Sequence, residues 1–436
     1  MSESSLSQVD ALQLWAVLGS EGKATTDLGI ARSSIPAYSV GVEAWLDRLA
    51  QTYLRQLCRK NAHFKVVIAP YGGGKTHFLM SLGTRALDEG FAAAYIACGP
   101  GASLDQPLDL YRQFVRQLRL PGEETAPGIR SLIREVVRFK RQQMQEHQVP
   151  NQEAAFDQWL RHVRDEPHPD NAFGRVMVEA LKAAWNPELD VVGDAAIRWL
   201  QGDLETLTRD ERQILRLGQI AANARADFGR NLLLSLVRFT REAGVHGVVL
   251  LFDEVETLFT ARGKSLLRVL SAMRVLVDLP TGVPGGVPLF GVFSAVPDVL
   301  NELSRYPALQ QRLAVVGASF DEGNDFAAQL LLERLDRQDH LLGAIGIRLI
   351  EVGEQALGIR FDQELQQANA LRLADVAAER NLEVDARRLF VKTWVNLLNL
   401  QRNEGERAFG EAELAQRYQG FFDAVKSSDA EEDDEP

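Results

Sequence analysis

The sequence predicts an α/β fold with a parallel sheet at its centre, interrupted and followed by helical regions. Four apolar runs, rich in β-branched or aromatic residues, occur at residues 64–69, 91–98, 248–252 and 287–296. Continuous apolar runs of this length are typical of strands that are buried on both faces of a parallel sheet. Segments with helical spacing of apolar residues follow these runs, which favours β–α units. A further run, at 315–320, completes a predicted five-stranded sheet.

The first predicted strand ends in a glycine-rich turn that leads into a helix. The stretch from residue 69 to residue 77 reads A-P-Y-G-G-G-K-T-H. Consecutive glycines can adopt positive φ and turn backbone N–H groups inward around phosphate oxygens, and the N-terminus of the next helix adds a dipole that attracts anions. The order of strand, glycine turn, Lys-Thr and helix therefore predicts a phosphate-binding loop. The alternative is an ordinary glycine-rich loop with an incidental lysine.

Within this loop, we expect the Lys75 ammonium to reach the β- and γ-phosphates of ATP and the Thr76 hydroxyl to bind Mg²⁺. One position departs from the usual pattern G-x-x-x-x-G-K-[ST], because Ala69 replaces the first glycine. That glycine eases the exit from the strand, whereas the later residues surround the phosphates, so we expect the loop to tolerate the change. The expected nucleotide-binding residues are Pro70, Tyr71, Gly72, Gly73, Gly74, Lys75, Thr76 and His77.

The third predicted strand ends in Asp253 and Glu254, at the edge of the sheet where α/β proteins place their sites. An aspartate here can hold Mg²⁺ through a water molecule, and the adjacent glutamate can orient or deprotonate the water that attacks the γ-phosphate. Two acidic residues after an apolar run are weak support alone, but the phosphate loop earlier in the same chain strengthens them. The alternative is that Asp253 only caps the next turn.

The fourth predicted strand ends near Ser294, and several arginines follow it. In nucleotide hydrolases with an Asp-Glu strand, the neighbouring strand carries a polar residue that senses the γ-phosphate, so Ser294 is a candidate for that role; a hydrogen-bonded core serine is the alternative. Arg305 and Arg312 lie where an arginine can reach a nucleotide in a neighbouring subunit. Arg387 and Arg388, at the start of a later amphipathic helix, are candidates for a lid arginine. Solvated surface arginines are the alternative for all four.

Breaks in these patterns divide the chain into six segments. Only helical patterns occur between the second and third strands, which predicts a helical insertion, and helical patterns at 325–336, 362–380 and 384–400 predict a small domain after the sheet. The predicted segments are an N-terminal segment at 1–35, the first part of the ATPase core at 36–120, the insertion at 121–244, the second part of the core at 245–322, a helical lid domain at 323–426 and an acidic disordered tail at 427–436.

Composition restricts the class of protein. The net charge is −12, and six acidic residues lie in the last eight positions, so the body of the chain is only mildly acidic. This argues against nonspecific coating of DNA, which requires an exposed basic excess, although a local basic patch is compatible with it. No apolar run approaches the roughly 18 residues of a membrane span, and the N-terminus does not resemble a secretory signal. The chain has only two cysteines, which favours a reducing cytosol. Its seven histidines are scattered, with no Cys or His pair at metal-ligand spacing, which argues against a structural zinc.

Taken together, the phosphate loop, the helical excursion, the Asp-Glu strand, the polar-tipped strand and the helical lid resemble an AAA+ ATPase. Four stretches also resemble the ATP-binding protein family of bacterial BREX phage-defence systems, often called BrxD: S-I-P-A-Y-S-V-G-V-E-A-W-L, Y-G-G-G-K-T-H-F-L, A-I-R-W-L-Q-G-D and G-V-V-L-L-F-D-E-V-E. The similarity covers about residues 27–400. The resemblance implies a cytoplasmic ATPase that uses ATP and Mg²⁺ and works with a methyltransferase and a helicase against phage DNA.

Three functions fit these observations. The first is an ATP-hydrolysing switch, the second is a non-catalytic, nucleotide-gated scaffold that recruits partners, and the third is an ATP-dependent loader or motor that acts on DNA. A homo-oligomer is compatible with all three, and no membrane association is expected. For the switch, the expected catalytic residues are Lys75, Glu254, Ser294, Arg312 and Arg387, and the expected metal ligands are Thr76 and Asp253.

Overall fold

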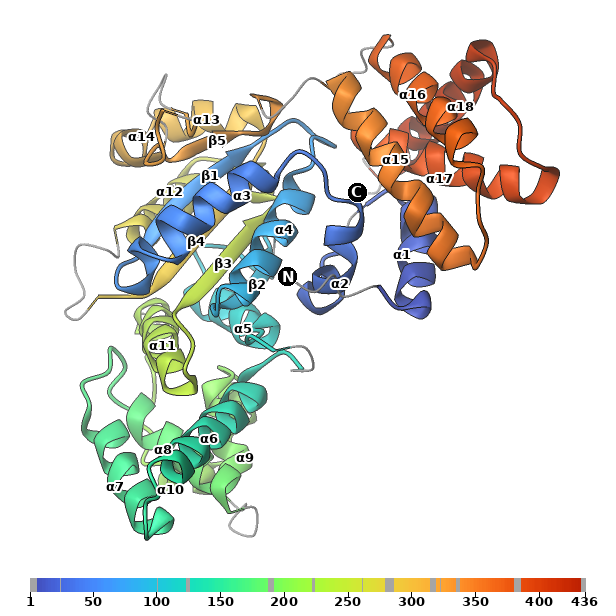
Figure 1. Cartoon of the computed structure of the whole chain (residues 1–436). Helices are drawn as coiled ribbons and strands as arrows, with labels where there is room; N and C mark the ends of the chain where they lie inside the picture. Colours follow the sequence, from blue (N-terminus) through green and yellow to red (C-terminus); the bar gives the residue numbers. More distant parts are fainter. Residues whose placement is uncertain are drawn as a thin grey trace.

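The computed structural model has a central parallel sheet with helices on both faces and a helical group at each of two ends (Figure 1). It describes residues 6–23, 25–99, 101–122, 126–186, 192–221, 224–260, 262–278, 286–313, 319–321, 323–334, 338–379 and 386–432. Among these residues, no helix combines the length and the apolar character that crossing a membrane requires.

The sheet has five strands in the order β2-β3-β4-β1-β5, and every neighbouring pair is parallel. Its strands are β1 (His63–Ile68), β2 (Ala92–Ala97), β3 (Val248–Asp253), β4 (Leu289–Ala295) and β5 (Gln329–Leu331). Strand β4 separates β1 from β3, although it comes later in the chain than both. Because all strands run in one direction, their carboxyl ends meet at one edge of the sheet.

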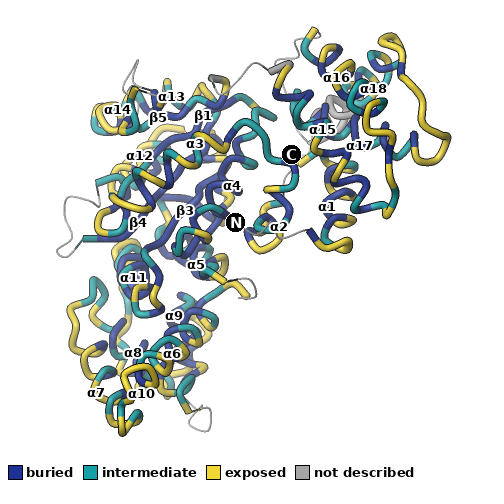
Figure 2. The backbone as a smooth tube through the Cα atoms, viewed as in Figure 1, coloured by how far each residue is buried: buried dark blue, intermediate teal, exposed yellow. Residues whose placement is uncertain are grey.

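Alternate residues of the strands supply two separate cores. On β1, Val66 and Ile68 join one cluster, whereas Val67 between them joins the other. Such alternation is the period of two that a strand imposes on its side chains. The first cluster contains helices between β2 and β3 and those that follow β3 up to residue 313, and the second contains the first four helices and the C-terminal helices from residue 338 onward. Figure 2 shows the strands and the inner sides of the helices as buried.

Before the sheet and around its first two strands, the chain forms five α-helices and two shorter helical turns. They are α1 (Gln8–Ser20), α2 (Leu28–Tyr38), α3 (Glu43–Leu49), the π-helix η1 (Ala50–Leu54), the 3₁₀ turn η2 (Leu57–Arg59), α4 (Lys75–Asp88) and α5 (Pro107–Gln117). Asp27 caps the N-terminus of α2, since its carboxylate accepts hydrogen bonds from the backbone N–H groups of Gly29 and Ile30.

Between β2 and β3, the described residues from 126 to 243 form only helices and turns. They comprise α6 (Ile129–Glu146), α7 (Gln152–Asp165), α8 (Phe173–Trp185), α9 (Gly193–Leu200), η4 (Leu204–Thr206), α10 (Arg209–Ile214), α11 (Arg225–Phe239) and η6 (Thr240–Ala243). Aromatic side chains hold part of this group together: the rings of Phe156 and Trp185 are stacked with centroids 4.0 Å apart. The predicted all-helical character of this region is thus confirmed.

After β3, the described residues form strands β4 and β5 together with helices, turns and loops. The elements are η7 (Val255–Thr260), α12 (Lys264–Val277), α13 (Pro297–Ser304), α14 (Pro307–Leu313), η9 (Leu332–Arg334), α15 (Gln338–Leu357), α16 (Gln363–Glu379), α17 (Ala386–Glu404) and α18 (Glu411–Glu432). Helix α1 packs among the C-terminal helices: the Trp15 indole N–H donates to Asn399 Oδ1 at 2.9 Å, and its ring lies against Gly353.

Two predictions about the end of the sheet and the C-terminus are wrong. The predicted helix at 325–336 contains instead strand β5, which pairs with the open edge of β1. The strand predicted at 315–320 lies mostly outside the described residues, and at its end Ser319 forms a parallel bridge to Gln329. Helix α18 continues to Glu432, so the segment predicted to be disordered from residue 427 is helical up to that point.

Candidate nucleotide-binding site

The predicted phosphate loop lies at the carboxyl edge of the sheet, between β1 and α4. The C-terminal helices lie beside this edge (Figure 1). The predicted acidic strand β3 and the polar-tipped strand β4 end at the same edge, because Val67 of β1 is in register with Ser294 and Ala97 of β2 is in register with Asp253. The topology therefore brings the loop and both strand tips together.

The loop owes its tight path to glycine. Gly72 and Gly74 have φ values of 66° and 88°, in the left-handed region that other residues avoid. A Cβ atom added at Gly73 would lie 2.7 Å from the Cβ of Ala69, which is too close for any side chain. The loop therefore accommodates alanine at its first position because the residue that faces it has no side chain.

The Lys75 ammonium is turned toward the loop itself. Its Nζ donates to the carbonyl oxygens of Ala69 at 3.1 Å and Pro70 at 3.2 Å, and Glu256 Oε1 lies 3.6 Å away. The Tyr71 ring covers it with a centroid 5.0 Å from Nζ. Lys75 is only 8 % exposed. These partners compensate the charge of the buried ammonium group.

Asp253 forms the hydrogen-bonded centre of the site. The carboxylate is 1 % exposed, and its Oδ2 accepts from Thr76 Oγ1 at 2.6 Å and from Tyr95 OH at 2.8 Å. Its Oδ1 accepts from Ser294 Oγ and from the backbone N–H of Glu254 at 3.0 Å. Four donors satisfy the carboxylate, as a buried charge requires. The structure thus brings Thr76, Asp253 and Ser294 together.

Tyr95 is a member of this cluster that the sequence does not indicate. It occupies the fourth position of β2, and its hydroxyl donates to Asp253. Burial, with the neighbouring Asp253 carboxylate, raises the pKa of Tyr95 far above its ordinary value. The hydroxyl therefore stays protonated and remains a donor. Its apolar neighbours in β2 give the residue the appearance of a core aromatic.

The donor set at this edge fits a magnesium ion. Thr76 and Asp253 offer a hydroxyl and a carboxylate oxygen in direct contact, and oxygen ligands are those that Mg²⁺ prefers. No group of three or more His, Cys, Asp or Glu residues that could hold a metal occurs among the described residues. An ion here would therefore depend on phosphate oxygens and water for its remaining ligands, as Mg²⁺ with ATP normally does.

Glu254 stands apart from this cluster. It is exposed and has a φ of 54°, a conformation that is uncommon for residues other than glycine. Its backbone explains the conformation in part, since its N–H donates to Asp253 Oδ1 and its carbonyl accepts from Thr257 N at 3.0 Å. Unusual backbone geometry of this kind concentrates at functional sites. The turn directs the exposed Glu254 out of the tip of β3.

A second glutamate, Glu256, lies deeper in the site and was not predicted. It belongs to η7, is 9 % exposed, and faces Lys75 through Oε1. Its Oε2 is buried and forms no hydrogen bond with any described residue. Burial raises the pKa of Glu256, while Lys75 acts in the opposite direction. Only its position after Asp253-Glu254 marks it in the sequence, where it reads as one more acidic surface residue.

Arg387 is the predicted arginine that reaches the loop within this chain. Its Nη1 donates to the carbonyl of Gly73 at 2.8 Å, although 314 residues separate the two in sequence. Burial lowers the pKa of Arg387. His77, at the start of α4, contacts Ser39 Oγ through Nε2 at 3.0 Å, and burial together with Arg387 lowers the pKa of His77 to about 4. This histidine is therefore neutral at pH 7.

The other predicted arginines lie elsewhere in this structure. Arg312 pairs with Asp278 at the end of α12 and donates to the carbonyl of Ala308 at 2.9 Å. Arg305 pairs with Glu302 at 2.6 Å and is largely exposed. Arg388 donates to the carbonyl of Glu21, after the end of α1, at 2.8 Å. A role of Arg312 toward a nucleotide in another subunit stays a prediction.

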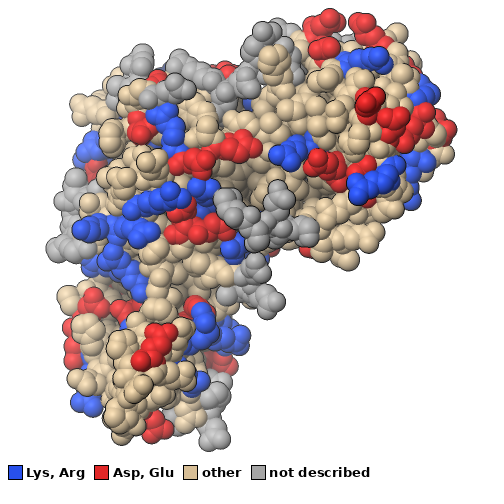
Figure 3. Space-filling model, viewed as in Figure 1, with Lys and Arg blue, Asp and Glu red and all other residues tan. Residues whose placement is uncertain are grey.

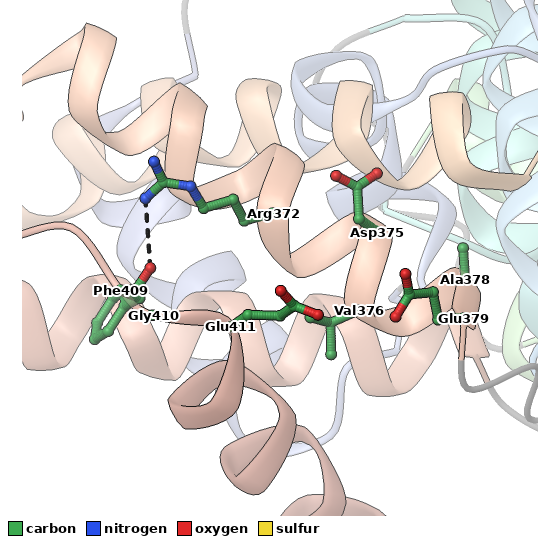
Figure 4. A pocket seen from close by; sticks show the side chains of 8 residues that line it. All are labelled: Arg372, Asp375, Val376, Ala378, Glu379, Phe409, Gly410 and Glu411. Atoms are coloured by element: carbon green, nitrogen blue, oxygen red, sulfur yellow. Dashed lines mark hydrogen bonds between the residues drawn. The ribbon is translucent and has the colours of Figure 1, made fainter.

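One cavity lies away from this site, between α16 and the start of α18, and has a volume of about 700 Å³. Its lining includes Arg372, Asp375, Glu379 and Glu411, which come from two helices and face a common space (Figure 4). Arg372 also donates to the carbonyl of Phe409 at 3.4 Å. None of the residues that line this cavity belongs to the phosphate loop.

Comparison with known proteins gives one match. The model of a family described as BREX system ATP-binding protein BrxC/D matches residues 30–413. The matched part includes the phosphate loop, the tips of β3 and β4, and the C-terminal helices up to the start of α18. No curated protein and no solved structure matches the chain. The family match confirms the resemblance that the four sequence stretches indicate.

Proposed function

The chain belongs to the BREX system ATP-binding protein BrxC/D family, and from that premise we propose that it is an AAA+-like switch that binds and hydrolyses ATP in bacterial defence against phage. The observation that carries this proposal is the convergence of Lys75, Thr76 and Asp253 at one edge of the sheet, with Ser294 bound to the same carboxylate. A loop with only a structural role does not require a buried lysine next to a glycine-rich turn and an aspartate that accepts four hydrogen bonds.

In the proposed site, backbone N–H groups of residues 72–76 and the N-terminus of α4 bind the phosphates. The Lys75 ammonium leaves the Ala69 and Pro70 carbonyls and binds the β- and γ-phosphates. Mg²⁺, when bound, neutralises charge on these phosphates. Thr76 would supply a ligand to it, and Asp253, which accepts a hydrogen bond from the Thr76 hydroxyl, would hold that hydroxyl in place and help to hold the ion.

Hydrolysis in this proposal depends on Glu254. Its exposed carboxylate at the tip of β3 orients the water molecule that attacks the γ-phosphate and accepts its proton. Ser294, whose hydroxyl now donates to Asp253, senses the γ-phosphate from the neighbouring strand. Arg312 is a candidate for a finger toward the nucleotide of a neighbouring copy, if the protein forms a homo-oligomer.

Two further features support the AAA+-like part of the proposal. Strand β4, with its polar tip, lies between the phosphate-loop strand β1 and the acidic strand β3. Arg387, at the N-terminus of α17, binds the carbonyl of Gly73 and so links the C-terminal helices to the loop. We propose that α15–α18 form a lid whose position depends on the nucleotide, with Arg387 as its contact to the site.

This function can be tested by measuring the rate of ATP hydrolysis and the affinity for ATP in the same variants. Glu254→Gln should retain ATP binding but lower ATP hydrolysis roughly 100-fold or more, since general bases contribute about that factor. Glu179→Gln, which changes an exposed Lys–Glu pair in α8, serves as the matched control and should leave turnover unchanged. Equal turnover in wild type and Glu254→Gln would remove Glu254 from the mechanism, even if ATP still binds.

A nucleotide-gated scaffold without turnover is the second candidate. The exposure of Glu254 favours this candidate. Bulk water surrounds an exposed carboxylate, so the carboxylate holds a single attacking water molecule less firmly than a base in a closed site does. In that case the nucleotide acts only by differential binding to two arrangements of the C-terminal helices. ATP binding with no hydrolysis above that of Glu254→Gln, in the presence of partners, would establish this candidate instead.

Partners and location follow from the family only as proposals. The methyltransferase and helicase of the same defence system are the proposed partners, in the cytoplasm. Direct action on DNA, as a loader or motor, has less support, because the net charge is −12 and the face of the molecule in Figure 3 carries acidic as well as basic side chains. Salt-dependent binding to DNA would revive that alternative.

A further inference from the structure

We propose that Glu256 is a counter-ion that holds Lys75 in the nucleotide-free protein and must release it when phosphate binds, so that this carboxylate weakens nucleotide affinity. The proposal rests on the proposed function, because it assigns Lys75 to the phosphates. It makes Glu256 a positioning residue for the lysine and gives the site a built-in competitor for ATP.

The geometry of the pair carries the first step. Glu256 Oε1 lies 3.6 Å from Lys75 Nζ, and both side chains are buried, at 9 % and 8 % exposed. An ion pair is much stronger in such surroundings than at the surface, because water screens it less. The Lys75 ammonium is therefore bound by the carboxylate as well as by the carbonyls of Ala69 and Pro70.

The second step concerns what Glu256 lacks. Its Oε2 is buried and receives no hydrogen bond from any described residue. Asp253, three residues earlier, accepts four hydrogen bonds and does not depend on Lys75. Among the described residues, Lys75 is the one ion-pair partner of Glu256, so a ligand that takes the lysine leaves a buried carboxylate without compensation, which is unfavourable.

The third step concerns the position of η7. The segment that carries Glu256 is fixed, since Thr257 Oγ1 donates to the carbonyls of Cys98 at 3.0 Å and Glu254 at 2.8 Å, and Val255 and Leu258 are buried. The backbone therefore cannot follow Lys75 toward the phosphates. When Lys75 turns to the phosphates, the Glu256 carboxylate therefore stays behind without its ion-pair partner, and this opposes binding.

Affinity measurements on the full-length protein test this inference. The probe is ATPγS with Mg²⁺, titrated into wild type, Glu256→Gln, Lys75→Ala and the double variant. Removal of the carboxylate charge should tighten binding roughly tenfold, the size expected for one charge-assisted interaction. In the Lys75→Ala background the same change should alter affinity by less than about twofold, because the effect acts through the lysine.

Two further variants separate the charge from the packing. Glu256→Asp keeps the carboxylate and should keep affinity close to wild type, whereas Glu256→Ala removes it and should tighten binding as Glu256→Gln does. A residue with only a structural role would lower affinity in all three. Glu179→Gln again provides a control change in a surface Lys–Glu pair.

Three results would overturn the inference. Unchanged or weaker binding in Glu256→Gln and Glu256→Ala contradicts a competing carboxylate. An equal gain with and without Lys75 means that Glu256 repels the phosphate directly rather than holding the lysine. Normal binding in Lys75→Ala contradicts the proposed function itself, and this outcome is distinct from the first two.

Discussion

Two lysines of the same β–α unit are buried, and they differ in what holds them. Lys65, in β1, is 1 % exposed; its Nζ donates to the carbonyl of Ala327 and, at 3.3 Å, to that of Asp325. The rings of Tyr53 and Phe320 cover it, with centroids 4.5 Å and 4.6 Å from Nζ. Lys75 has two loop carbonyls and the Glu256 carboxylate as partners.

The difference shows that burial alone does not identify a functional lysine. The partners of Lys65 come from the segment before β5 and from two aromatic side chains, so the lysine fastens that segment to the sheet. The partners of Lys75 belong to a glycine loop and to an under-satisfied glutamate, and phosphate oxygens can replace all of them. We therefore expect Lys65 to act on stability and Lys75 to act on ligand binding.

The largest effect should come from Lys75→Ala. Loss of charge-assisted bonds to two phosphates should weaken Mg²⁺-ATP binding by roughly 100-fold or more, measured by calorimetric titration. Lys65→Met is the matched control, because it changes a buried lysine ten residues away, and it should leave ATP affinity within about twofold. Equal losses in the two variants would break the comparison, since both lysines would then act on the site.

The next effect concerns stability. Lys65→Ala removes the buried stem and leaves a cavity, so it should lower the free energy of unfolding by about 2–3 kcal/mol in urea denaturation. Lys65→Met fills the same space without a buried charge and should be close to neutral. If Lys65→Ala proves neutral as well, the lysine does not fasten the segment before β5 to the sheet.

The pH dependence of stability sharpens the comparison further. Burial lowers the pKa of Lys65 to about 7, from 10.5 in an unfolded chain, against the opposing charge of Asp325. Between these pH values the unfolded chain binds a proton that the folded protein does not bind, so folding stability should rise with pH, by at most about 1.4 kcal/mol per pH unit. The rise, measured as the difference between wild type and Lys65→Met, should be confined to the range from about pH 7 to about pH 10. A flat difference would show that Lys65 stays protonated in the folded state.

The smallest expected effect lies in the Asp253 cluster. Tyr95→Phe removes one of four donors to a buried carboxylate and should lower stability by about 1 kcal/mol. Tyr71→Phe is the control, because Tyr71 is 58 % exposed and its hydroxyl is outside this cluster. Thermal unfolding of both variants without nucleotide makes the measurement. Equal stabilities would mean that the other three donors suffice for Asp253.

Much of the fold can be predicted because its signals are local. The predicted helix at 362–380 is α16, and the predicted strands at 64–69 and 248–252 are β1 and β3, each within one residue at each end. Strand β5 was not predicted, because a strand of three residues is too short to show a periodic pattern and its first residue is the polar Gln329. That side chain is buried only because its Nε2 donates to the carbonyl of Leu313 at 3.0 Å.

The residues of the site also fall into two groups, those that a local motif predicts and those that only the folded structure reveals. The phosphate loop and Asp253-Glu254 are contiguous motifs, and the structure brings Lys75, Thr76 and Asp253 to one edge, as a parallel sheet requires. Glu256 has no motif of its own, since only the 3₁₀ turn after β3 directs its side chain to Lys75. Arg387 was one of four equivalent arginines in the sequence, and only the packing of the C-terminal helices selects it.

The most direct test of the central claim is the dependence of ATP affinity on Mg²⁺ concentration in wild type and in Asp253→Asn. The claim is that Lys75, Thr76 and Asp253 bind one magnesium-bound nucleotide. Wild-type affinity should increase as Mg²⁺ is added, whereas Asp253→Asn should bind ATP without Mg²⁺ about as wild type does and gain little from the metal. The same gain from Mg²⁺ in both proteins would contradict the claim.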